Sequence, residues 1–147
     1  MTEETGMVAR WVRLGALVLL ALPQVVIGGW AVFATKRWYE SFPGFDPRLV
    51  AAEPPYNAHL AADAGAGFLA TGLALALAAV WGRRSGILVA LVAYAAFSVP
   101  HVIYHAANPA PGLTDTEDVV NVFVLASGLV FAAVLAWGVV RDGGQRA

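Results

Sequence analysis

The chain has 147 residues, of which 59% are apolar and 13% are charged, and it carries a formal net charge of -1 and no cysteine. Soluble domains are usually close to half apolar and a quarter charged, so this composition excludes a disordered chain, a coiled coil and a disulfide-rich secreted module. The balanced charge gives no basic surface for nucleic acid, and an integral membrane protein surrounded by lipids is the class that remains.

Four apolar stretches are each long enough for a helix to cross the hydrocarbon core, which takes about 20 residues. In chain order, the predicted spans are residues 12–34, 58–81, 86–106 and 119–140. Residues 35–57 form a polar and aromatic outer loop, and the other connections are short. Because backbone groups in lipid must bond to each other, we predict an all-α four-transmembrane-helix bundle. We expect an antiparallel, up-down arrangement in a single membrane domain over residues 1–147.

The basic residues predict the orientation of the bundle. If the N-terminus is cytoplasmic, the inner side carries Arg10, Arg13, Arg83, Arg84, Arg141 and Arg146. The outer side then carries only Lys36, Arg37 and Arg48. An excess of Lys and Arg marks the cytoplasmic side of membrane proteins. We therefore predict a multi-pass protein of the plasma membrane with both termini in the cytoplasm.

Small side chains recur every four residues along two of the predicted spans. On the second span they are Ala62, Ala66, Ala70, Ala74 and Ala78. On the fourth span they are Gly128, Ala132 and Ala136. Stripes of this kind let helices approach closely in lipid. We expect them to be packing surfaces, and they also permit a homo-oligomer.

Two pairs of ionisable side chains lie inside predicted spans, where such groups are costly and usually mark a site. The second span carries His59 and Asp63, and the third carries His101 and His105, each pair one helical turn apart. A short turn joins the two spans, so both pairs are expected at the same depth near the extracytoplasmic face. We therefore predict that the four side chains converge on one metal ion.

Three imidazoles and one carboxylate suit zinc, iron, manganese or copper, and the pattern does not decide among these metals. Glu53, Asn57, Asp118 and Asn121 are expected around the ligands, because Asp118 opens the fourth span at the same outer level, Asn121 lies one turn further in, and Glu53 and Asn57 precede the second span. Either Asp63 or Glu53 is the candidate general base if the metal activates water.

The outer loop carries aromatic side chains at Trp38, Phe42 and Phe45, interrupted by Pro43 and Gly44. This composition favours a segment that lies along the membrane surface. Two interpretations stay open: a lid over the site, or a tether between the first two spans.

The stretch FPGFDPRLVAAEPPYNAHLAADAGAGFLATG, followed by SVPHVIYHAAN, resembles uncharacterised small four-span integral membrane proteins of actinobacteria. The features that look shared are N-x-H-x-x-x-D, here Asn57, His59 and Asp63, and P-H-x-x-x-H, here from Pro100 to His105. The resemblance implies the same four-helix layout. In size and number of spans the chain is also loosely similar to DoxX-like proteins.

Three hypotheses for the function stay open. The first is a metal-dependent enzyme that acts on a lipid or quinone-like substrate near the outer face. The second is a b-type haem protein with axial ligands from the second and third spans, such as His59 with His105. The third is a non-catalytic accessory or binding subunit, in which the polar side chains form a structural network.

Overall fold

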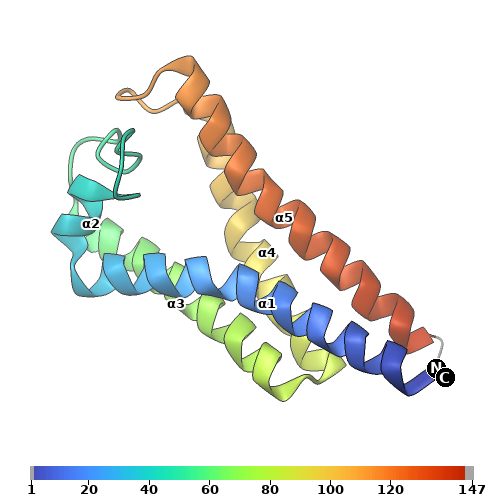
Figure 1. Cartoon of the computed structure of the whole chain (residues 1–147). Helices are drawn as coiled ribbons and strands as arrows, with labels where there is room; N and C mark the ends of the chain where they lie inside the picture. Colours follow the sequence, from blue (N-terminus) through green and yellow to red (C-terminus); the bar gives the residue numbers. More distant parts are fainter. Residues whose placement is uncertain (1, 145–147) are drawn as a thin grey trace.

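The computed structural model describes residues 2–144, which contain five α-helices and no strand. Their bounds are α1 Thr2–Phe33, α2 Thr35–Ser41, α3 Ala58–Trp81, α4 Arg84–Ala107 and α5 Asp115–Gly144 (Figure 1). Four of them contain segments long and apolar enough to cross a membrane: Arg10–Phe33, Ala58–Trp81, Arg84–Ala107 and Asp115–Asp142. The prediction of an all-helical chain with four spans is confirmed.

The helix ends follow from capping side chains. Helix α3 begins after Asn57, whose side-chain oxygen accepts a hydrogen bond of 3.1 Å from the backbone N–H of Leu60. Helix α5 begins earlier than residue 119 because Thr114 and Glu117 form a capping box. The Thr114 N–H donates to the Glu117 carboxylate at 2.8 Å, and the Glu117 N–H donates to the Thr114 hydroxyl at 3.4 Å. Gly82 ends α3 with a positive φ of 64°.

The region predicted as an outer loop contains the short helix α2 and then residues 42–57. Helix α2 is fixed by Trp38, which is 5% exposed and packs in a cluster with Ala31 of α1 and Ala61 of α3. The segment is therefore anchored to the first two long helices.

Helices α1 and α3 pack closely through glycines. A Cβ added to Gly65 would lie 2.7 Å from the Cβ of Ala31, and one added to Gly72 would lie 2.7 Å from the backbone nitrogen of Val25. From the α1 side, a Cβ on Gly28 would collide with the backbone of α3. The two backbones touch here, as small residues allow in membrane helices.

The alanine stripe predicted as the packing face of α3 is not that face. Ala66 and Ala70 are exposed, and only Ala78 of the stripe is buried. The buried face of α3 instead follows Ala61, Gly65, Phe68, Gly72 and Leu75. On α5 the prediction holds better, since Ala132 is buried and Gly128 lies against Tyr94 of α4. Self-association through the exposed alanines stays a prediction.

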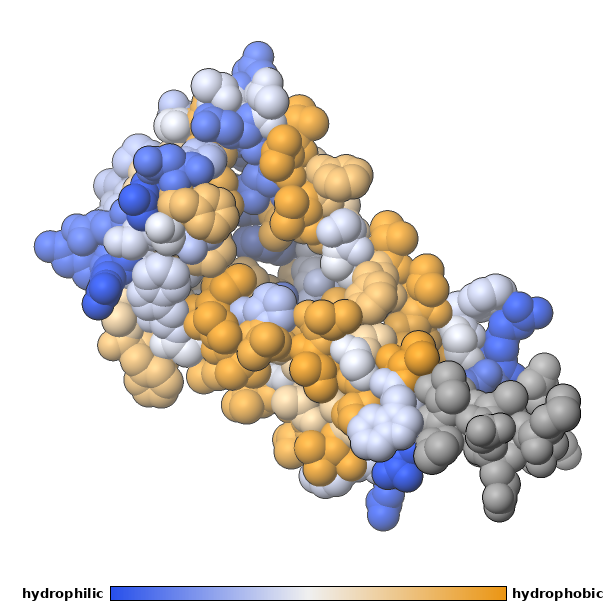
Figure 2. All heavy atoms as spheres, in the orientation of Figure 1, coloured by the Kyte–Doolittle hydropathy of each residue, from blue (hydrophilic) through white to orange (hydrophobic). Residues whose placement is uncertain are grey.

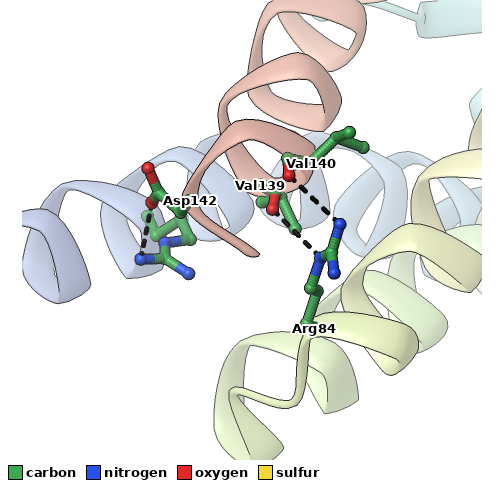
Figure 3. Close-up of polar contacts among 5 residues, drawn as sticks. Arg84, Val139, Val140 and Asp142 are labelled. Atoms are coloured by element: carbon green, nitrogen blue, oxygen red, sulfur yellow. Dashed lines mark hydrogen bonds and ion pairs between the residues drawn. The ribbon is translucent and has the colours of Figure 1, made fainter. Parts of the chain in front are cut away.

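The four long helices share a core at one end of the molecule, which we call the closed end. The four largest fully buried side chains come one from each helix: Leu17, Leu75, Ile87 and Val139. Polar contacts add to this core (Figure 3). Arg13 of α1 pairs with Asp142 of α5 at 3.1 Å.

The last turns of α5 are also tied to the start of α4. The Arg84 guanidinium donates to the backbone carbonyls of Val139 and Val140 at 3.2 and 3.1 Å (Figure 3). Basic side chains are favourable there because they bond the carbonyls near a helix C-terminus.

The helices separate toward the opposite end, which we call the open end. Helices α1 and α3 stay together, α4 and α5 stay together, and the two pairs diverge like the arms of a V (Figure 1). The open end carries α2 and residues 42–57 on one arm and residues 108–114 on the other. The two connections meet where the Gly112 N–H donates to the Ala52 carbonyl at 3.1 Å.

The glycine contact predicts a position-specific loss of stability. Gly28→Ala places a methyl group against the α3 backbone, so we expect it to lower the free energy of unfolding by about 1–3 kcal/mol. The adjacent Gly29→Ala is the matched control, because a Cβ there meets nothing within 4 Å. Unfolding in mixed micelles, followed by circular dichroism, measures both. Equal stability of the two variants would contradict the packing described.

Candidate functional site

A cavity of about 590 Å³ lies between the two helix pairs, toward the open end. All five helices and residues 42–57 contribute to its wall. Figure 2 shows a hollow on this face of the molecule, bordered by apolar and polar residues. The volume falls in the range of small-molecule sites, which is about 300–1,000 Å³.

The wall is mainly apolar and carries a limited set of polar side chains. Those that line the cavity are Gln24, Trp38, Tyr39, Glu53, Asn57, Tyr94, Ser98, His101, Tyr104, His105, Asn121 and Ser127. A few polar groups on an apolar wall are typical of a site that orients a ligand. The cavity is therefore the candidate functional site.

Helix α4 positions two histidines on the cavity wall. His101 and His105 lie one turn apart, with ring centroids separated by 4.8 Å. Two phenylalanines hold the His101 ring: Phe97 stacks on it at 5.8 Å, and Phe68 meets it edge-on at 5.6 Å. The contacts with Phe68 and Phe97 thus fix the position of the His101 ring.

Residues 42–57 bring Glu53 to His105. The Nδ1 atom of His105 lies 3.9 Å from the Oε1 atom of Glu53, and the two side chains are 19% and 31% exposed. Two contacts shape the loop that carries Glu53: Arg48 donates to the Ser41 carbonyl at 2.9 Å, and the Glu53 N–H donates to the Val50 carbonyl at 3.1 Å. Leu49, Val50 and Glu53 of this loop line the cavity, and the lid and tether interpretations both stay predictions.

Two buried polar atoms of cavity-lining residues have no hydrogen-bond partner within residues 2–144. They are the Oε1 atom of Glu53, an acceptor, and the Nε1 atom of Trp38, a donor. The 3.9 Å to His105 is too long for a hydrogen bond. Buried polar groups are nearly always satisfied, so these two atoms are exceptions, and both are shielded from the cavity by the atoms around them.

The second predicted pair lies elsewhere. His59 and Asp63 contact each other at 3.3 Å, but their side chains are 82% and 63% exposed, and neither lines the cavity. The reason is the rotation of α3: its glycine face is pressed against α1, so the face with His59 and Asp63 points away.

The structure therefore does not bring the four predicted metal ligands together. Among the residues it describes, no group of three or more His, Asp or Glu side chains is placed to hold a metal ion. His59 and Asp63 do not line the cavity that His101 and His105 line. His59 and His105 are therefore not placed to bind one haem in that cavity. A metal at a smaller set of these side chains, or a haem, stays a prediction.

Three of the four residues expected around the ligands do line the cavity: Glu53, Asn57 and Asn121. Asp118 does not. Its carboxylate instead accepts a hydrogen bond of 3.1 Å from the Ala110 N–H and fixes the connection between α4 and α5. Of the two candidate bases, Glu53 lies at the cavity and Asp63 lies outside it.

Several polar residues of the cavity were not predicted from the sequence. Gln24 of α1 is the clearest, and its Oε1 atom lies 3.4 Å from the Thr71 hydroxyl of α3. A glutamine inside an apolar span is itself a signal of function. Tyr94 and Ser98 lie on the same face of α4 as His101 and His105. Their spacing of three and four residues could have predicted this from the sequence.

Comparisons with protein-family models, with curated proteins and with solved structures find no match to this chain.

The rotation of α3 is testable because the chain contains no cysteine. His59→Cys places a thiol on an exposed face, whereas Ser98→Cys places one at a position that is 8% exposed. In detergent we expect a maleimide to modify the first variant roughly tenfold faster, because modification follows exposure. Asp63→Cys should behave like His59→Cys. Slow modification at both α3 positions would mean that this face is turned inward.

Proposed function

We propose that this protein is an integral membrane protein that binds a lipid-soluble ligand in the cavity between its two helix pairs. The observation that carries the proposal is the cavity itself, with its volume of about 590 Å³, its mainly apolar wall and its limited set of polar side chains. A lipid or a quinone-like molecule combines an apolar body with a small polar head, and it suits such a wall.

The arrangement of α1 and α5 supports entry of the ligand from the membrane. The two helices converge at the closed end, where Arg13 meets Asp142, and they diverge toward the open end (Figure 1). The cavity wall uses both helices, with Pro23 and Gln24 from α1 and Leu125 and Gly128 from α5. A molecule dissolved in lipid would pass between them.

The charges support an orientation of the bundle. The closed end carries Arg13, Arg83, Arg84 and Arg141, whereas Lys36, Arg37 and Arg48 lie toward the open end. By the positive-inside rule, the closed end and both termini are cytoplasmic, and the helices alternate in direction across the plasma membrane. The cavity then lies in the extracytoplasmic half of the bilayer.

Binding without chemistry needs only the cavity, and it is the function we favour. A second candidate, a metal-dependent enzyme, is favoured by one observation: His101, His105 and Glu53 share one wall. On this hypothesis the histidines would hold the metal and Glu53 would act as the base. Metal analysis decides it: the purified protein would contain metal that His101→Ala loses and His59→Ala keeps, and negligible metal in all three removes the candidate.

Photolabelling tests the binding function. The probe is decanol carrying a diazirine, used on the protein in lipid nanodiscs. We expect saturable labelling of peptides from α4 and α5 that line the cavity. Ala64 lines the cavity, so Ala64→Phe should reduce the saturable labelling by about tenfold or more, because the ring occupies the space.

Ala66→Phe is the matched control, since Ala66 is exposed on another face of the same helix and should keep full labelling. Labelling that never saturates, or that both variants retain equally, would contradict binding in the cavity.

A further inference from the structure

We propose that the ligand is a cationic amphiphile and that the carboxylate of Glu53 recognises its ammonium head. This inference rests on the proposed binding function and adds the charge of the ligand. It joins four observations: the charges on the cavity wall, the exposed part of the Glu53 side chain, the aromatic side chains that line the same cavity and the acidic character of the open end.

The charged side chains on the wall select against an anionic head. Among the described residues that line the cavity, Glu53 is the one acid, and no lysine or arginine is present. A phosphate or carboxylate head would be buried beside the Glu53 carboxylate with the imidazoles of His101 and His105 but no lysine or arginine to pair with, which is unfavourable. An ammonium head would instead pair with the carboxylate.

Glu53 also presents part of its side chain to the cavity. Its Oε1 atom is buried without a hydrogen-bond donor, and the nearest basic group, Nδ1 of His105, is 3.9 Å away. The rest of the side chain is partly open, with 31% of its surface exposed. A primary or secondary ammonium would supply a charge-assisted hydrogen bond, and a quaternary ammonium would supply charge alone.

Aromatic rings line the same space from three helices. Trp38 belongs to α2, Phe68 to α3 and Tyr104 to α4, and the ring of Tyr104 lies 5.7 Å from that of His105, the neighbour of Glu53. Aromatic walls attract ammonium groups through the electron-rich faces of the rings, and such cages are a known mode of quaternary ammonium recognition.

The charges of the open end have the matching sign. The segments at the open end, namely α2, residues 42–57 and the first turns of α3 and α5, contain seven acidic residues against three basic ones, Lys36, Arg37 and Arg48. An excess of acidic groups around a cavity raises the local concentration of cations. Long-range attraction and the group on the wall therefore favour the same ligand.

Competition against the decanol photoprobe tests the inference in nanodiscs of uncharged lipid. The competitors share a decyl chain and carry a trimethylammonium, a hydroxyl or a sulfate head. We expect the ammonium compound to displace the probe at about tenfold lower concentration than decanol, and the sulfate compound to be the weakest.

Glu53→Gln should remove the preference for ammonium, measured within that variant as the ratio of the concentrations at which decanol and the ammonium compound displace the probe. Glu40→Gln is the control, because Glu40 is an exposed acid on α2 that does not line the cavity. Equal potency of the three heads, or a preference that survives Glu53→Gln, overturns the inference and leaves the binding function standing. Absence of saturable probe binding in the unmodified protein overturns both.

Discussion

The close contact between α1 and α3 is the constraint on which the rest of the structure depends. In lipid no hydrophobic force draws helices together, so association relies on packing and on small residues that let backbones touch. Gly65 and Gly72 of α3 meet the backbone of α1, and Gly28 of α1 meets the backbone of α3. This contact fixes the rotation of α3, and it leaves α4 and α5 to pair with each other.

Two helix pairs that share a core only at one end enclose space at the other. Leu17, Leu75, Ile87 and Val139 fill the closed end, and the space at the open end is bounded by the diverging pairs and by residues 42–57. Because α4 forms one wall, the face of α4 decides the chemistry. His101 and His105 lie on that face, and the loop adds Glu53. The wall of the cavity is therefore mainly apolar, with His101, His105 and Glu53 as polar groups on one side.

Local features of this protein were predictable from sequence, whereas helix rotation was not. The four spans depend on length and hydropathy, and the caps at Asn57 and at Thr114 with Glu117 depend on neighbouring residues. Alanine and glycine are both small, so either could mark the packing face of α3. The alanines repeat more regularly and were predicted as that face, whereas the glycines form the contact with α1. His59 and Asp63 were predicted to face inward because ionisable groups are costly in lipid, although their side chains are largely exposed. When two faces of a helix both carry small side chains, the sequence does not show which face packs against the neighbouring helix.

The central claim is that Glu53 of the loop lies against α4 at the cavity, whereas the α3 face that carries His59 and Asp63 points away from the cavity. Thiol cross-linking in the cysteine-free chain tests this claim most directly. One double variant is Glu53→Cys with His105→Cys, and the other is His59→Cys with His105→Cys. The account predicts rapid cross-linking of the first pair by a short bifunctional thiol reagent, because the native side chains approach to 3.9 Å, and no cross-linking of the second. Efficient cross-linking of the second pair and none of the first would contradict it.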